Sequence, residues 1–138
     1  MNLNRHTSRP SVFISSTFID LKQERQEVAR ALKNRGVEPN ALDVQSASSQ
    51  TPRKKILDGI KESDFIILII GDRYGSIIPE MTGSSSISIT HWEYIEALKR
   101  GKPIIAFLKD IKIEEANTCQ IKKFRYIVSA AHTPRATE

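Results

Sequence analysis

The sequence predicts an α/β fold in which a mainly parallel sheet is covered by helices on both faces. Short apolar segments of strand length alternate with helical segments along the chain, an order typical of such folds. The clearest strand, residues 65–70 (FIILII), shows no polar alternation, which indicates burial on both faces as in a parallel sheet. Right-handed crossovers between successive parallel strands then place helices on both sides of the sheet.

The first strand and the first helix are predicted near the N-terminus. Residues 11–15 (SVFIS) form a short apolar segment that is rich in strand-forming residues. Asp20 is predicted to cap the helix that follows. Leu21, Val28 and Leu32 share one face of this helix, and that face is expected to pack on the sheet.

The later elements continue the same alternation. Residues 37–42 are a weaker strand candidate because Pro39 interrupts them, and Thr51 with Pro52 is predicted to begin the second helix. The other predicted segments are the strand 65–70, a serine-rich loop over 82–88, the helix 90–100, the strand 103–108 and a final helix that carries Ile121, Phe124 and Val128.

One α/β domain is expected over residues 11–130, because a chain of 138 residues is close to the common domain size. Residues 1–10 are expected to be a flexible N-terminal arm, and residues 131–138 a polar tail that links to further domains. Four strands can be recognised. A fifth strand at the sheet edge either lies in the tail or is missing because the chain is a piece of a longer protein, and we favour the second explanation.

The composition favours a soluble cytoplasmic protein. Hydrophobic residues make up 39% and charged residues 27% of the chain. The longest apolar run is far shorter than the roughly 20 residues that cross a bilayer, so no membrane contact is expected, and no secretory signal is recognisable at the N-terminus. The single cysteine, Cys119, excludes an internal disulfide and fits a reducing compartment; we expect it to be a small buried hydrophobe.

The net charge of +5 is modest and spread along the chain. A basic balance favours anionic partners, but no zinc-ligand spacing, RNA-binding aromatic pattern or recognition-helix pattern accompanies it. Nucleic acid is therefore not an expected partner.

Candidate site residues lie where the predicted strands end, because ligands of open parallel sheets bind outside the carboxyl ends of the strands. The hydroxyls of Ser15, Ser16 and Thr17 follow the first strand, and they either bind a phosphate or ribose or simply turn the chain. Asp43, after the second strand, is either a ribose ligand or a solvated loop carboxylate. No P-loop and no G-x-G-x-x-G pattern is present.

Two more candidates follow the third strand. Arg73 is either a phosphate ligand or an exposed loop arginine, and Tyr74 either stacks on a base or packs in the core. The start of the third helix raises a further question, because Thr90 and Glu93 fit the capping box S/T-x-x-E. Glu93 is therefore a structural cap, an active-site carboxylate, or both, and a place in the first turn would favour its anionic form.

Residues 12–25 (VFISSTFIDLKQER) resemble the hallmark F-I-S-S-T-F-x-D-L-x-x-E-R of a TIR-like domain family of unknown function. The resemblance continues through residues 63–76 (SDFIILIIGDRYGS) and 88–108 (SITHWEYIEALKRGKPIIAFL). Members of that family often lie N-terminal to STAND-type NTPases in defence or signalling proteins. The resemblance implies a flavodoxin-like fold of the TIR type, a three-layer sandwich with a mainly parallel sheet of four to five strands.

More distantly, the chain is similar to TIR domains that cleave NAD and to nucleoside deoxyribosyltransferases. In NAD-cleaving TIR domains a catalytic glutamate stands about eight residues before a G-K, a place that Glu93 occupies relative to Gly101 and Lys102. A W-x-x-x-E reading from Trp92 would instead select Glu96.

The resemblance implies an enzyme that cleaves or rearranges NAD or a related nucleotide, with no cofactor and NAD itself as the candidate substrate. Glu93 would then be the catalytic residue, the loop from Ser15 to Phe18 would hold the nucleotide, and Trp92 or Tyr74 would stack on a ring. The alternative is a non-catalytic module that assembles with copies of itself or with other TIR-like domains.

Overall fold

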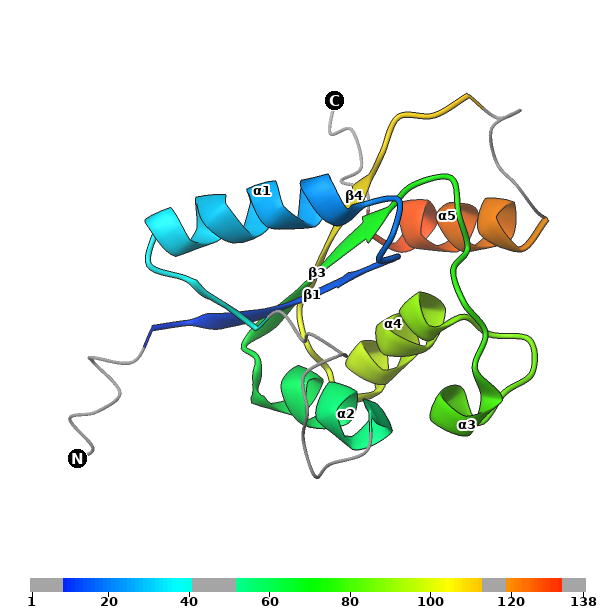
Figure 1. The fold of residues 1–138 in the computed structure, drawn as a ribbon, viewed down its shortest axis with the longest axis horizontal. Coiled ribbons are helices and arrows are strands. Elements are labelled where there is room, and N and C mark those ends of the chain that lie inside the picture. Colours follow the sequence, from blue (N-terminus) through cyan, green and yellow to red (C-terminus); the bar gives the residue numbers. More distant parts are fainter. Residues whose placement is uncertain (1–8, 41–51, 113–118, 133–138) are drawn as a thin grey trace.

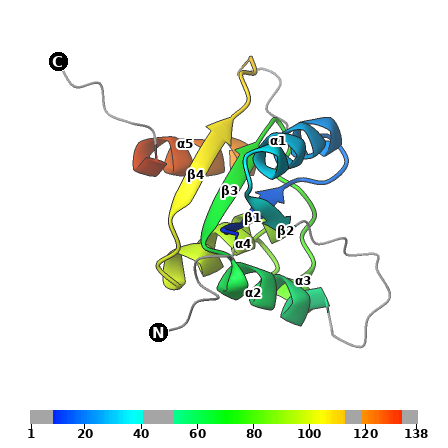
Figure 2. The same ribbon diagram turned by 90° about the vertical axis from the view of Figure 1, so that its left-hand side faces the viewer.

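The computed structural model describes residues 9–40, 52–112 and 119–132. They form an α/β fold in which four parallel strands are flanked by helices, as the sequence predicts (Figures 1 and 2). The elements are β1 (Ser11–Ser16), α1 (Lys22–Asn34), β2 (Glu38–Asn40), α2 (Pro52–Glu62), β3 (Phe65–Ile70), α3 (Pro79–Thr82), α4 (Ile89–Lys99), β4 (Ile104–Leu108) and α5 (Cys119–His132).

The sheet has the order β2-β1-β3-β4, and each neighbouring pair is parallel. β1 and β3 occupy its centre, and from its second residue onward each of them is buried along its length. Because both faces of these strands are covered, their sequences carry apolar residues at consecutive positions instead of alternating with polar ones. β2 is short and lies at one edge, where Pro39 is tolerated.

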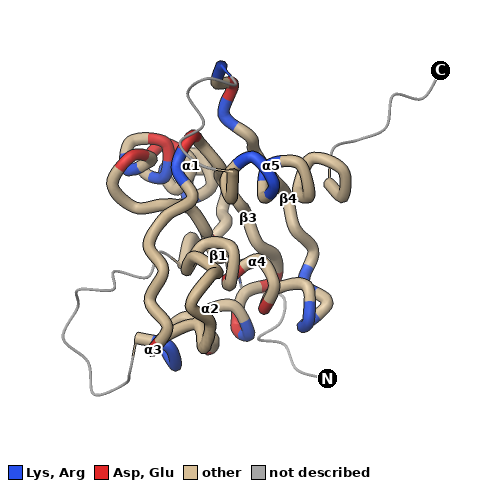
Figure 3. Tube along the Cα trace, turned by 90° about the vertical axis from the view of Figure 1, so that its right-hand side faces the viewer, with Lys and Arg blue, Asp and Glu red and all other residues tan. Residues whose placement is uncertain are grey.

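The two faces of the sheet pack against different helices. α1 covers one face, where its Val28 and Leu32 lie against Ile14 of β1 and Ile67 of β3. α2, α4 and α5 cover the other face, and Figure 1 shows α1 on one side of the sheet with α2 and α4 on the opposite side. The amphipathic face predicted for the first helix is thus confirmed. The outer surface of α1 carries acidic and basic residues in a mixed arrangement (Figure 3).

Two predicted helix caps are wrong. α1 begins after Leu21, which makes no side-chain cap bond, and Asp20 lies one residue too early to serve as the cap. α4 begins one residue before Thr90: Ser88 is its cap, and the Ser88 hydroxyl accepts a hydrogen bond from the His91 amide at 3.2 Å. Since Ser88 has the extended backbone of a cap and Thr90 lies inside the helix, the capping box cannot form.

Three smaller details complete the comparison with the predicted elements. The short helix α3 lies before the serine-rich loop and was not predicted. Cys119 is exposed, so its expected burial is wrong. The predicted cap at Thr51 lies outside the described residues.

The edge strand β4 leaves part of the sheet uncovered. Ile104, Ala106 and Leu108 pack on the side of α5, whereas Ile105 and Phe107 point to the opposite face and are about half exposed, at 48% and 51%. In the hydrophobic cluster on this opposite face, α1 packs with residues of β1 and β3. None of the described helices is long and apolar enough to span a membrane.

Candidate functional site

The order of the strands places a crevice at the carboxyl ends of β1 and β3. From β1 the chain crosses to β2 on one side, and it then returns to β3 on the other side. At such a reversal the connecting loops diverge and leave room for a ligand outside the sheet. The two loops concerned are the residues after Ser16 and the residues after Ile70.

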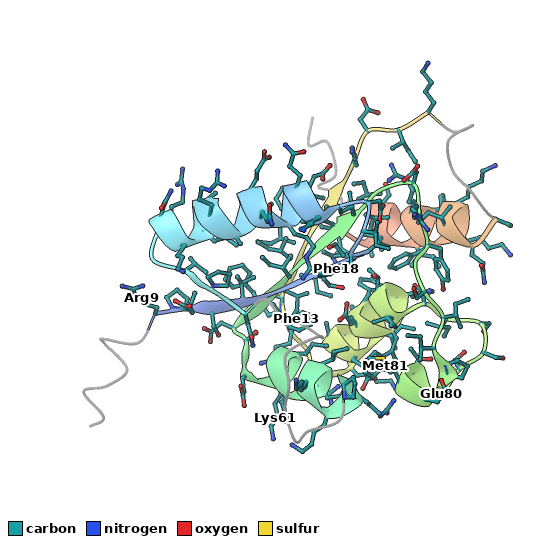
Figure 4. The ribbon with its side chains drawn as sticks, viewed as in Figure 1. Arg9, Phe13, Phe18, Lys61, Glu80 and Met81 are labelled. Carbon is teal, nitrogen blue, oxygen red and sulfur yellow. The ribbon has the colours of Figure 1, made fainter. Side chains whose placement is uncertain are left out.

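A cleft of about 670 Å³ occupies this place. Its walls come from the β1–α1 loop, the loop after β3, the start of α4 and parts of α1, α2, α3 and α5. Phe18 follows β1 by two residues, and Met81 lies on α3; both are labelled in Figure 4 and contribute to the walls. The predicted site residues that line the cleft are Ser16, Thr17, Phe18, Arg73, Tyr74 and Glu93.

Two carboxylates line this cleft, Asp20 of the β1–α1 loop and, on α4, Glu93. Glu93 lies in the second turn of α4 and is 8% exposed. Its Oε1 accepts a hydrogen bond from the Ser15 hydroxyl at 2.7 Å, which ties α4 to β1. Because Ser88 is the helix cap, Glu93 has no capping role, and the capping box that competed with a site role is excluded.

Burial dominates the ionisation of Glu93. Loss of solvation raises the pKa of the carboxyl to about 7, although the Ser15 hydrogen bond and the positive charge of Arg25 both act to lower it. The expectation that its place in the helix favours the anion is therefore wrong. The group changes its protonation near neutral pH, which suits a catalytic carboxyl.

Glu96 is in a different environment although it is also buried on α4. Its carboxylate accepts a hydrogen bond from Arg100 at 3.0 Å and forms an ion pair with Lys99 at 3.2 Å. Burial opposes the ionisation of Glu96, but hydrogen bonds from Arg100 and Lys99 outweigh it and lower its pKa. Glu96 does not line the cleft. Of the two glutamates that the sequence leaves open, Glu93 is thus the one in the cleft.

Arg25 is a cleft residue that the sequence reasoning missed. It lies on α1, and its guanidinium donates to the Ser16 hydroxyl at 3.4 Å and lies over the Phe18 ring at 5.2 Å from the centroid. Burial lowers the pKa of Arg25, and the charge of Glu93 opposes this effect. The available signal was its place as the last residue of the hallmark segment 12–25.

Tyr74 lines the cleft, but it packs mainly in the hydrophobic core. It is 8% exposed, its hydroxyl lies 2.5 Å from Nδ1 of His91, and its ring packs edge-on against Phe124. His91 in turn stacks on Phe124 with ring centroids 4.3 Å apart. Of the two interpretations of Tyr74, packing in the core describes its surroundings, and only part of its surface faces the cleft.

The other predicted residues differ in their places. Trp92 lies in the hydrophobic cluster with Phe13 and Ile56, and the Arg53 guanidinium lies over its ring at 5.1 Å. Arg73 is an exposed residue at the cleft wall. Asp43 lies outside the described residues.

The cleft wall is tightly packed at Gly75. Its φ of 98° lies in the region that favours glycine, and a Cβ at this position would be 2.9 Å from Cγ2 of Thr17. Thr17 is 9% exposed, and its hydroxyl has no hydrogen-bond partner in the part of the chain that the structure describes. The loop after β3 thus fits closely against the β1–α1 loop because position 75 has no side chain.

The described residues contain no group of three or more His, Cys, Asp or Glu side chains that could hold a metal ion. The cleft offers the buried carboxyl of Glu93 with a pKa of about 7, a serine that donates to it and an arginine cation near it.

Comparisons with known proteins show a family and a similarity to solved structures. A family model described as "Domain of unknown function (DUF4062)" matches residues 11–135. No curated protein matches the sequence. Among the chains of solved structures that match is the CMP N-glycosidase BcmB of Clostridium botulinum, which is 21% identical; the alignment covers 87% of this chain and 98% of that one with a TM-score of 0.46.

Proposed function

The chain belongs to the DUF4062 family, a domain of unknown function, and we propose that it is a TIR-like enzyme module that cleaves the N-glycosidic bond of NAD or a related nucleotide. The observation that carries this proposal is the carboxyl of Glu93. It is buried in a cleft at the carboxyl ends of β1 and β3, is held by Ser15, and has neither a capping role nor an ion-pair partner within 4.0 Å among the described residues.

Such a carboxylate suits this reaction because positive charge develops on the sugar. When the bond between C1′ and the nicotinamide nitrogen breaks, its electron pair goes to nicotinamide, which leaves as a neutral molecule. Water then adds to C1′ and releases a proton. The ionised Glu93 stabilises the oxocarbenium-like transition state, and a poorly solvated site strengthens that attraction.

The protonation of Glu93 decides how activity depends on pH. With a pKa of about 7, the carboxyl is largely protonated at pH 6 and largely ionised at pH 8. A leaving group that is already cationic needs no proton, so the ionised form is the active one. We expect kcat/KM for NAD to rise with pH and to level off above about pH 8, since this parameter reports the pKa of the free enzyme.

The test measures, between pH 6 and 8.5, the release of nicotinamide from NAD and NADP and the release of the base from nucleoside 5′-monophosphates by the full chain. Glu93→Gln should abolish turnover while thermal unfolding shows an intact fold. Glu96→Gln is the matched control, because it removes a buried carboxylate from the same helix outside the cleft, and it should retain turnover. Full activity of Glu93→Gln, or no turnover of any substrate at high protein concentration, contradicts the proposal.

A second candidate function, self-association without catalysis, is favoured by β4. This strand is a free edge of the described sheet and exposes Ile105 and Phe107 beside its unpaired backbone. If this edge joins two copies, Phe107→Lys should convert an oligomer into a monomer in sedimentation experiments, whereas the lysine substitution of exposed Tyr126 on α5 should not. A chain that stays monomeric at all concentrations contradicts this candidate.

A further inference from the structure

The guanidinium of Arg25 is a cation, and no carboxylate of the described residues forms an ion pair with it. Five ion pairs within 4.0 Å occur among these residues, and Arg25 takes part in none of them. Its side chain is only partly exposed, and burial lowers its pKa. A guanidinium placed away from bulk water without a counter-ion is costly unless a ligand provides the missing charge.

None of the nearby carboxylates pairs with Arg25. Asp20 lines the same cleft, but it forms no ion pair within 4.0 Å among the described residues. Glu24, the residue before Arg25, forms an ion pair with Lys109 at 2.8 Å. Oε1 of Glu93 accepts the Ser15 hydrogen bond, and Glu93 attracts Arg25 only across a separation greater than 4.0 Å. Arg25 and Glu93 thus line the same cleft without forming an ion pair within 4.0 Å.

Two contacts hold the guanidinium in place and leave most of its donors unused. Nη1 donates to the Ser16 hydroxyl at 3.4 Å, and one face of the group lies over the Phe18 ring. Arginine has five N–H donors, and the hydroxyl of Ser16 accepts from one of them. The Phe18 ring is itself 47% exposed, so an apolar surface lies beside the cation at the cleft wall.

We propose that Arg25 is the anion subsite of the cleft and binds a phosphate of the ligand, so that the module recognises nucleoside phosphates in preference to nucleosides. The planar guanidinium can meet a phosphate with two parallel hydrogen bonds. The neighbouring Phe18 gives the sugar or base an apolar contact. The nucleotide nature of the ligand rests on the proposed function, whereas the anion subsite rests on Arg25 itself.

The test is a binding experiment with inorganic phosphate, AMP and adenosine as probes. In the wild-type chain, AMP should bind about 10- to 100-fold more tightly than adenosine, the range expected for hydrogen bonds to a charged group. Inorganic phosphate should shift the NMR signal of the Arg25 Nε–H. Arg25→Gln should remove the preference for AMP, and Arg25→Lys should restore part of it.

Arg30→Gln is the matched control, because Arg30 is an exposed arginine on the same helix outside the cleft, and it should leave the preference unchanged. The proposal is overturned if Arg25→Gln keeps the full preference for AMP in a folded protein. It is equally overturned if the Arg25 signal responds to neither inorganic phosphate nor AMP at millimolar concentration.

Failure of this proposal can be told apart from failure of the proposed function. If the chain releases bases from nucleosides and nucleotides with equal kcat/KM and requires Glu93, the enzymatic function stands and the phosphate subsite fails. If AMP binding requires Arg25 but no substrate is turned over, the subsite stands and the enzymatic function fails. Glu93→Gln should abolish turnover and keep the preference for AMP over adenosine.

Discussion

Replacement of Glu93 by glutamine should change how the stability of the protein depends on pH. The folded state raises the pKa of this carboxyl from 4.5 to about 7, chiefly through burial. Below pH 4.5 the group is protonated in both states, and its contribution to stability is fully present. As pH rises towards 7, the unfolded chain ionises first, so unfolding becomes easier and this contribution is lost.

The size of the effect follows from the two pKa values. The two pKa values, about 7 and 4.5, differ by about 2.5, and each pKa unit corresponds to 1.36 kcal/mol. As pH rises from below 4.5 to above 7, the free energy of unfolding of the wild type therefore falls by about 3 kcal/mol through this group. The loss is large against the total stability of roughly 5–15 kcal/mol for a domain. Glutamine keeps the size of the protonated side chain but cannot ionise, so the Glu93→Gln protein should lack this loss.

The assay is urea unfolding of both proteins between pH 4 and pH 8. The free energy of unfolding of Glu93→Gln minus that of the wild type should increase by about 3 kcal/mol across this range, with most of the change between pH 4.5 and 7. A difference that stays constant with pH refutes the burial of an ionisable Glu93.

Glu96→Gln provides a control of opposite sign in the same assay. Because Arg100 and Lys99 together outweigh the burial of Glu96 and lower its pKa, its contribution is present above pH 4.5 and is lost as pH falls through the folded pKa. The stability of the wild type relative to Glu96→Gln should therefore decrease towards low pH, in contrast to the comparison with Glu93→Gln.

Three further predictions concern single contacts. Ser15→Ala removes the hydrogen bond to the carboxylate and should raise the Glu93 pKa further, by about 1 to 2 pKa units. A carbon-detected NMR titration measures this pKa, and an unchanged value would contradict the prediction. Ser88→Ala removes the cap of α4 and should cost about 1 kcal/mol in urea unfolding without changing the Glu93 pKa. Gly75→Ala should cost about 1–3 kcal/mol, because its φ is 98° and the new Cβ would meet Thr17; equal stability would show that the loop relaxes freely.

The fold could be predicted because the signals of its central elements are local. β3 shows the apolar run of a strand with two covered faces, and its bounds, Phe65–Ile70, are those that the sequence predicts. The face of α1 that holds Val28 and Leu32 follows from helical spacing alone. The caps could not be fixed in this way, because Ser88 and Thr90 both have suitable side chains and only the backbone at residue 88 decides between them.

The site was predicted less well because it depends on packing between distant elements. The hydroxyls after β1 were expected, since strand ends are visible in the sequence. α4, however, is buried on almost every side, so spacing does not show that Trp92 faces the core and Glu93 the cleft. Arg25 looks like any charged residue on a surface helix until α1 is placed beside the β1–α1 loop.

A comparison of the two buried glutamates of α4 shows what kind of role Glu93 has. Glu96 stabilises the fold in the ordinary way, because two cations offset the cost of its burial and keep it ionised. Glu93 has no such partner in the described chain, and its charged form is disfavoured by the fold. If this side chain only had to fill space, the protein would be more stable with a side chain that has no ionisable group. The carboxyl of Glu93 therefore lowers stability at neutral pH in a cleft, and residues that sacrifice stability in this manner are characteristic of functional sites.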